Sequence, residues 1–399
     1  MKLVDDQPRV VTFKRPHLRV YLRVHLRVLS RQAAVWGVQP LRSFMLVGTD
    51  PVRSKIRESF ARSPVDALLD PRLAARLERL DVFSRKILSG KLLGERRSKR
   101  RGRSIEFDDF RDYTPGDDLR HIDWNAYARL DRLFIKLFRE EEDLALHLVV
   151  DASPSMDTGN PNKLLFALRL ATALGAIGLA NQNRVSASVL GRRVAPKTLA
   201  AIDASPPAAS SNQLPFASLR PLRGRTSLHA LARFFAAALD PSASTNSEPL
   251  SLVPAPADLN TSLRSLASRG LGRGICVVMS DFLDEPGVDA GLRALAATDP
   301  GVMDIYCLHV LSPGEVNPEL ERDAGLQGDL RLTDAETGRA REVTVSPALI
   351  ARYRRSVDRF CADLRARCLS LGLAPLRVTT DAPIERVVLD SLRRGGLLR

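Results

Sequence analysis

From residue 144 onward, short apolar runs alternate with longer segments in which apolar residues recur every three or four positions. The short runs have the length of buried strands, and the longer segments have the spacing of helices. We predict strands at 144–150, 184–190, 275–280, 303–311 and 376–380, and helices at 163–180, 226–239, 260–269, 287–298 and 347–372. This alternation favours right-handed crossovers and a sheet covered by helices on both faces. The predicted fold class is therefore α/β, with a doubly wound, mostly parallel, Rossmann-like sheet.

Three other kinds of segment interrupt or precede this alternation. Residues 330–345 predict a small β-hairpin insertion. Two long loops rich in Pro, Ala and Ser, 195–222 and 241–258, are typical of binding surfaces or of disorder. Upstream, residues 63–89 have a helical pattern. The α/β domain is thus predicted to follow a helical or irregular N-terminal extension.

Composition divides the chain into three predicted segments: a basic segment at 1–50, an intermediate segment with its own motif at 51–143, and the α/β domain at 144–399. Within the first, residues 17–28 alternate as a strand does, but their four-residue repeat also lines arginines along one side of a helix. The basic segment is open to three interpretations. It precedes a true start at Met45, it is an arm that contacts a membrane or nucleic acid, or it is a solvated or disordered tail.

The net charge of +14 is concentrated in the first quarter of the chain. Residues 1–103 carry a net charge of +16, and residues 104–399 carry −2. A basic surface over the whole fold would favour a nucleic-acid-binding protein. The observed distribution leaves nucleic-acid binding as an alternative that depends on the first quarter alone.

Cysteine usage and apolar run lengths indicate the compartment. The four cysteines form no Cys-x-x-Cys pair and lie in strand-like or helix-like runs, which indicates buried, reduced thiols. No uninterrupted apolar run approaches the roughly 18–20 residues that cross a bilayer. Residues 1–50 lack the apolar core and cleavage site of a secretory signal. We therefore expect a cytoplasmic protein without a transmembrane segment.

The clearest candidate chemistry follows the first strand of the α/β domain. Asp151, Ser153 and Ser155 place one carboxylate and two hydroxyls at alternate positions of a loop, Thr226 offers a hydroxyl at a helix start, and Asp281 ends another buried strand. Ligands gather outside the carboxyl ends of parallel strands, so we expect these oxygens to meet there and hold Mg²⁺ or Mn²⁺. In the alternative interpretation, the two serines cap the following helix and Asp151 accepts bonds from local amides.

A second polar motif occupies residues 102–142. Tyr113 opens a turn with Pro and Gly at its centre, and arginines alternate with acids as an ion-pair network requires. Trp124 is expected to anchor this segment against the sheet. The adjacent Asp117 and Asp118 have a second interpretation as a catalytic carboxylate pair.

Together the two motifs resemble the bacterial and archaeal family named domain of unknown function 58 (DUF58). The likeness covers roughly residues 85–399 and rests on Glu106-Phe107, the run from Arg111 to Trp124, and the Asp-x-Ser-x-Ser strand end. That strand end also resembles the metal-ion-dependent adhesion site of von Willebrand factor A-type domains. Two departures from the family pattern stand out. Many members begin with two membrane-spanning helices, whereas we expect none in this sequence, and Gly224-Arg225-Thr226 stands here in place of Gly-Gly-Thr.

The resemblance implies a von Willebrand factor A-like domain without known enzymatic activity. Its metal residues carry over as Asp151, Ser153, Ser155, Thr226 and Asp281. An Asp or Glu of a protein partner is expected to complete the coordination of the cation. Genes of this family commonly neighbour those of MoxR-type AAA+ ATPases, so the expected partner is such an ATPase, in complex assembly or metal insertion.

The expected function is therefore a non-enzymatic protein-interaction module. A metal-dependent hydrolase is the second class, because two aspartates are enough to hold a catalytic Mg²⁺. The sequence contains no phosphate-binding Gly-x-x-x-x-Gly-Lys-Ser/Thr loop, no Gly-x-Ser-x-Gly turn and no His-Glu-x-x-His helix, which disfavours that class. Nucleic-acid binding through the basic first quarter is the third class.

Overall fold

A computed structural model describes the chain in thirteen stretches, of which the longest are 144–194 and 340–398. The described residues are 63–77, 79–82, 105–115, 117, 119–140, 144–194, 215–239, 252–254, 258–284, 287–298, 303–321, 328–333 and 340–398. The predictions for residues 1–50 lie outside this part of the chain. The fold divides into two units: an α/β unit, and a small unit spanning Ser89–Leu144.

Six strands form the sheet of the α/β unit, in the order β12-β9-β8-β3-β4-β6. Its parallel members are β3 (Ala145–Asp151), β4 (Arg184–Leu190), β8 (Gly274–Ser280), β9 (Met303–Leu311) and β12 (Ala374–Thr379). β6 (Phe216–Leu222) closes one edge and runs antiparallel to β4. The five predicted strands agree with the parallel ones to within two residues, so the mostly parallel α/β sheet is confirmed.

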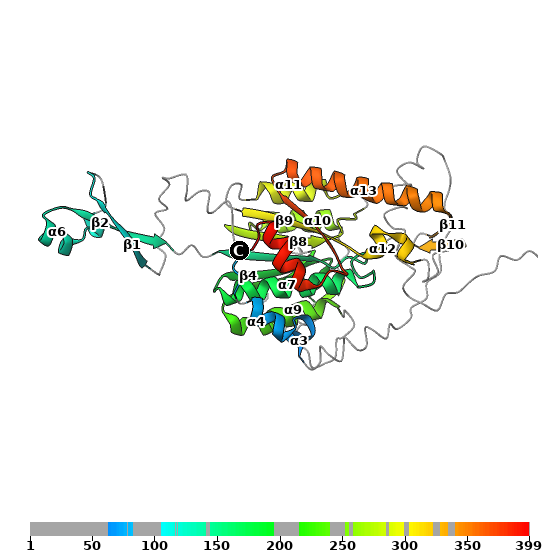
Figure 1. Cartoon of the computed structure of the whole chain (residues 1–399), viewed down its shortest axis with the longest axis horizontal. Helices are drawn as coiled ribbons and strands as arrows, with labels where there is room; N and C mark the ends of the chain where they lie inside the picture. Colours follow the sequence, from blue (N-terminus) through cyan, green and yellow to red (C-terminus); the bar gives the residue numbers. More distant parts are fainter. Residues whose placement is uncertain are drawn as a thin grey trace, which may run out of the picture. The chain divides into compact units, whose positions relative to one another are not determined.

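Helices cover both faces of this sheet (Figure 1). On one face lie α7 (Lys163–Ala180) and α9 (Leu228–Leu239), with α3 (Pro64–Leu68) and α4 (Pro71–Leu77) packed against them. On the other lie α10 (Leu259–Ser268), α11 (Asp289–Ala297) and α13 (Pro347–Ser370). The C-terminal turns are α14 (Ile384–Arg386) and η5 (Val387–Leu392). The core beneath α10, α11 and α13 includes the free, buried thiols of Cys276, Cys307 and Cys368, as predicted, whereas the free thiol of Cys361 is only half-buried.

Several elements differ from the prediction or complete it. β6 lies inside the segment 195–222, which we predicted as a loop. Only the first two residues of β6 are buried and the rest alternates weakly, so the sequence lacks the pattern of a buried strand there. The short strands β5 (Arg192–Val194) and β7 (Leu252–Pro254) pair with each other, and β7 lies in the second predicted loop. The predicted hairpin forms from β10 (Gly328–Thr333) and β11 (Ala340–Val345).

The predicted boundary at residues 51–143 needs correction. Its N-terminal helix is two short helices, because a proline at position 71 begins a new one. These helices belong to the α/β unit: α4 packs on α7, and the Asn181 side-chain amide donates to the Leu80 carbonyl at 2.6 Å. Only the remainder of the predicted segment forms the second unit.

The second unit is a two-stranded antiparallel sheet of β1 (Ile105–Asp112) and β2 (Phe134–Glu140), with η2 (Leu119–His121) and α6 (Trp124–Leu130) between them. Arg111 pairs with Asp117 at 2.5 Å, and this bond holds the pKa of that carboxyl well below its usual range. The motif therefore contains an ion pair, as predicted. Within this unit Trp124 is 61% exposed and meets Tyr127 edge to face.

Glycine is required at position 274, the start of β8, because the backbone there passes very close to β3. A Cβ there would lie 2.0 Å from the Ala145 carbonyl oxygen, and its φ of +151° is unfavourable for other residues. We expect Gly274→Ala to lower the free energy of unfolding by about 2–4 kcal/mol, measured by urea denaturation. Gly272→Ala is the matched control: its φ is +71°, nothing lies within 4 Å, and a cost of about 1 kcal/mol is expected. Equal costs for the two variants would contradict the steric explanation.

Among the described residues, one helix is long and apolar enough to span a membrane, judged by length and composition only. This helix is α7, and 78% of its apolar window is buried inside the α/β unit. A core helix of this kind passes the same test, so α7 is weak evidence for a membrane span.

Candidate functional site

The candidate site lies where β3 and β8 end, side by side at the centre of the sheet. The chain passes from β3 to β4 on one side and returns to β8 on the other, so the strand order reverses between β3 and β8. This edge is where open α/β sheets bind ligands. Asp151 is the last residue of β3, and Asp281 directly follows β8.

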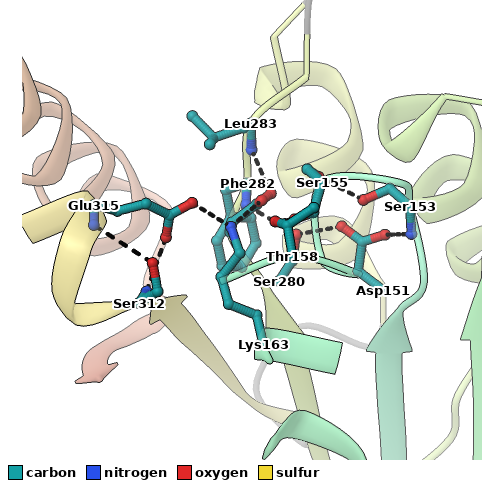
Figure 2. A network of polar contacts seen from close by, with 11 residues as sticks. Asp151, Ser153, Ser155, Thr158, Lys163, Ser280, Phe282, Leu283, Ser312 and Glu315 are labelled. Atoms are coloured by element: carbon teal, nitrogen blue, oxygen red, sulfur yellow. Dashed lines mark hydrogen bonds and ion pairs between the residues drawn. The ribbon is translucent and has the colours of Figure 1, made fainter. Parts of the chain in front are cut away.

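Asp151 is 2% exposed, and both of its carboxylate oxygens accept hydrogen bonds. The Ser153 amide donates to Oδ1 at 2.9 Å, and the Ser280 hydroxyl donates to Oδ2 at 2.5 Å (Figure 2). Burial and, after it, the charge of Asp281 raise the pKa of Asp151 to about 6, although the hydrogen bonds from Ser280 and Ser153 lower it. The fold thus holds a carboxylate whose negative charge is poorly compensated at neutral pH.

The hydroxyls of Ser153 and Ser155 converge beside this carboxylate. Their oxygens lie 2.8 Å apart, and Ser155 is 1% exposed. Adjacent ligands of an octahedral Mg²⁺, each at about 2.0–2.1 Å from the ion, lie about 3 Å apart. The pair therefore fits two neighbouring ligand positions of a hard cation. Neither hydroxyl caps α7, because the cap is Asn162, whose side chain accepts from the Leu165 amide.

Asp281 is fully buried, and its carboxylate faces the ammonium group of Lys163. The Lys163 ammonium donates to its Oδ2 at 2.9 Å, and the Leu283 amide donates to its Oδ1 at 3.1 Å. Lys163 also donates to Glu315 Oε1 at 2.6 Å. Burial alone lowers the pKa of Lys163, but the charges of Asp281 and Glu315 and the hydrogen bonds to them together raise that pKa above its usual value.

Sequence reasoning missed Lys163 and Glu315. Glu315 lies in the turn α12 (Pro313–Val316) after β9, where it forms a capping box with Ser312 and its carbonyl accepts from the Tyr353 hydroxyl. The available signal was a lysine at the first position of a mostly apolar helix. His309, near the same ion pair, is buried between the rings of Phe282 and Phe360, and burial lowers its pKa to about 4.

Thr226 is not brought to the site, which corrects our prediction. Because β6 runs antiparallel, it ends with Leu222 beside Val185, at the start of β4. The turn η3 (Arg225–Ser227) follows, and Gly224 faces Gln182, which also precedes β4. Thr226 is exposed and lies at the amino edge of the parallel strands, opposite Asp151.

The donors at the site are two aspartates and two serine hydroxyls. Over the described stretches of the chain, no group of three or more His, Cys, Asp or Glu side chains is placed to hold a metal ion. Tight, carboxylate-rich coordination is therefore not what these residues offer. Asp151, Ser153 and Ser155 fit a weakly charged Mg²⁺ or Mn²⁺ site, which keeps positions for water or another ligand.

The raised pKa of Asp151 has a consequence for stability. The folded state holds this proton more tightly than the unfolded chain, so the contribution to stability is present below about pH 4. It is lost as the pH rises through about 6, by about 3 kcal/mol. In EDTA at pH 7, we expect Asp151→Asn to raise the free energy of unfolding by about 1–3 kcal/mol, with the gain vanishing near pH 4. Urea denaturation at both pH values tests this, and a less stable variant at pH 7 would contradict it.

Comparisons with known proteins place the whole site inside a matched family range. The family described as "Protein of unknown function DUF58" matches residues 109–362. The chain is similar to uncharacterized protein Mb1516 of Mycobacterium bovis and uncharacterized protein Rv1480 of Mycobacterium tuberculosis, each 29% identical over 350 residues covering 85% of this chain and 95% of the relative. It is also similar to uncharacterized protein MAV169 of Mycobacterium avium, 33% identical over 145 residues, covering 35% of this chain and 79% of the relative.

Proposed function

Because the chain belongs to the DUF58 family, with its candidate site inside the matched range, we propose that it is a non-enzymatic protein-interaction module that uses Mg²⁺ or Mn²⁺. The observation that carries the proposal is the convergence of the Ser153 and Ser155 hydroxyls, 2.8 Å apart, beside buried Asp151 at the sheet edge. This arrangement supports an adhesion-type site in a von Willebrand factor A-like sheet.

Different residues supply the oxygen ligands of the cation and its balancing charge. Ser153, Ser155 and Asp151 supply the oxygens, and Asp281 supplies negative charge through water, since the Lys163 ammonium bound to its Oδ2 repels a cation. When bound, the cation supplies positive charge that an Asp or Glu of a partner completes. Thr226 has no part in this site, because it lies at the opposite edge.

Hydrogen bonding at the site supports binding over catalysis. Each carboxylate oxygen of Asp151 and Asp281 already accepts a bond from the chain. A general base needs a carboxylate oxygen within reach of the proton it removes. These bonds hold both carboxylates in place as fixed charges beside the proposed cation, an arrangement that suits an interaction module.

The proposed partner is a MoxR-type AAA+ ATPase, with which the protein works in the cytoplasm in complex assembly or metal insertion. The resemblance of residues 102–142 and 151–155 to the DUF58 pattern supports this choice. The partner's contribution to the site is an exposed Asp or Glu.

Partner binding is expected to depend on the cation. With the ATPase from the same organism immobilised, affinity in Mg²⁺ should fall at least about tenfold in excess EDTA and return with added Mn²⁺, because the partner's carboxylate loses its counter-charge. EDTA also strips Mg²⁺ from nucleotide on the ATPase, so Asp151→Asn in Mg²⁺ buffer is the matched control and should bind as weakly. Equal affinity of wild type and variant would overturn the mechanism.

A further inference from the structure

Lys163 is a fully buried lysine whose ammonium reaches from the first turn of α7 to the ends of two strands. It is 0% exposed and donates both to Asp281, after β8, and to Glu315, after β9. Figure 2 shows its side chain between these two carboxylate-bearing segments, beside the loop of Asp151 and the two serines. Charged lysines are almost never fully buried unless they are paired.

The surroundings fix both partners of this ammonium. Glu315 Oε2 accepts from the Ser312 amide at 2.8 Å, and the Glu315 carbonyl accepts from the Tyr353 hydroxyl on α13. Asp281 Oδ1 accepts from the Leu283 amide. Each carboxylate is therefore oriented by the backbone, and neither is free to turn toward another cation without breaking these bonds.

Charge at the site depends strongly on Lys163. Asp151, Asp281 and Glu315 are three buried acids, and Lys163 compensates one of their charges directly at Asp281. In a partly dry interior, a single charge changes the affinity for a divalent ion by a large factor. The ammonium both repels an incoming cation and occupies the carboxylate oxygen that would otherwise ligate it.

We propose that Lys163 is a positioning residue that withholds Asp281 from direct coordination and keeps the cation site weak until a partner's carboxylate arrives. This inference rests on the proposed function. It makes the site dependent on its partner: the chain supplies too little negative charge to hold the cation tightly, so the partner supplies the rest. A purely structural Lys163 would have the opposite effect on removal, because loosening the loop would weaken the site.

The sign of the change in cation affinity separates these two roles. Lys163→Met leaves two buried acids unpaired and is at risk of misfolding, so the comparison is made in a Glu315→Gln background, where one acid remains. Calorimetric titration of Mn²⁺ alone into Glu315→Gln and into Glu315→Gln/Lys163→Met should show about tenfold tighter binding by the double variant. Arg169→Gln, which removes a positive charge from an exposed position of the same helix, is the control and should stay within about twofold of wild type.

Three outcomes distinguish this inference from the proposed function. Tighter binding by the double variant supports the positioning role, including the case in which wild type binds too weakly to measure. Equal or weaker binding by the double variant, with measurable binding by wild type, overturns the inference and leaves the proposed function standing. Binding by none of the proteins, at Mn²⁺ concentrations up to millimolar and with acetate present as the missing carboxylate, overturns both.

If the double variant does not fold, the single variant Glu315→Gln provides the test. It should bind Mn²⁺ several-fold more weakly than wild type, and unchanged or tighter binding overturns the inference.

Discussion

Lys163→Met is expected to lower the free energy of unfolding by about 3–5 kcal/mol, the usual cost of removing one partner from a buried ion pair. Asp281 and Glu315 are 0% and 2% exposed, so neither carboxylate gains water when the ammonium is lost. Their charges then repel each other in a poorly solvated environment. Folding must either protonate one of them or tolerate the unpaired charge.

Urea denaturation of the wild type and the variant measures this loss. The matched control is the triple variant Lys163→Met/Asp281→Asn/Glu315→Gln, which removes all three charges and keeps the shapes of both acids. Since no charge is left unpaired, the triple variant should recover most of the stability. A loss below about 1 kcal/mol in Lys163→Met would contradict the buried ion pair that the structure shows.

The second large effect concerns the cation. Asp151→Asn and Ser155→Ala are each expected to weaken Mn²⁺ binding about 100-fold, because each removes an oxygen donor or the charge that holds the ion, and even outer partners of a metal site contribute 10–100-fold. Asparagine retains an acceptor for the Ser153 amide, and its amide nitrogen donates to the Ser280 hydroxyl oxygen, which reverses the direction of that bond and keeps the two groups paired. The change tested is therefore charge rather than fold.

Thr226→Ala is the control for this series. Its side chain lies at the amino edge of the sheet, so the variant should bind Mn²⁺ within about twofold of wild type. A loss in Thr226→Ala comparable to that in Ser155→Ala would contradict the placement of the site. Retained binding in Asp151→Asn would contradict the role of the carboxylate.

Apolar periodicity was sufficient to predict the parallel strands and the main helices, because β3, β4, β8 and β9 are almost entirely buried and the helices present regularly spaced apolar residues to the core. α7 matches the predicted bounds, and the parallel strands differ by at most two residues. The convergence of Asp151 and Asp281 also followed from the sequence, because parallel strands place their carboxyl ends at one edge.

The sequence did not predict the features that depend on a strand with a weak apolar pattern or on partners far away in the chain. β6 is an edge strand with two buried residues, and its antiparallel direction sends Thr226 to the wrong edge for the site. The partners of Lys163 are 118 and 152 residues away, so no local spacing indicates them. A buried lysine is predictable only once the sheet order is known.

The most direct test of the account is the anomalous difference density of crystals grown with Mn²⁺ and acetate. We expect one strong peak within about 2 Å of both the Ser153 and Ser155 hydroxyl oxygens, with Lys163 still bound to Asp281. A site without a peak at saturating Mn²⁺, or a peak coordinated by other residues, would contradict the central claim that the carboxyl edge of β3 and β8 is a cation-dependent docking site.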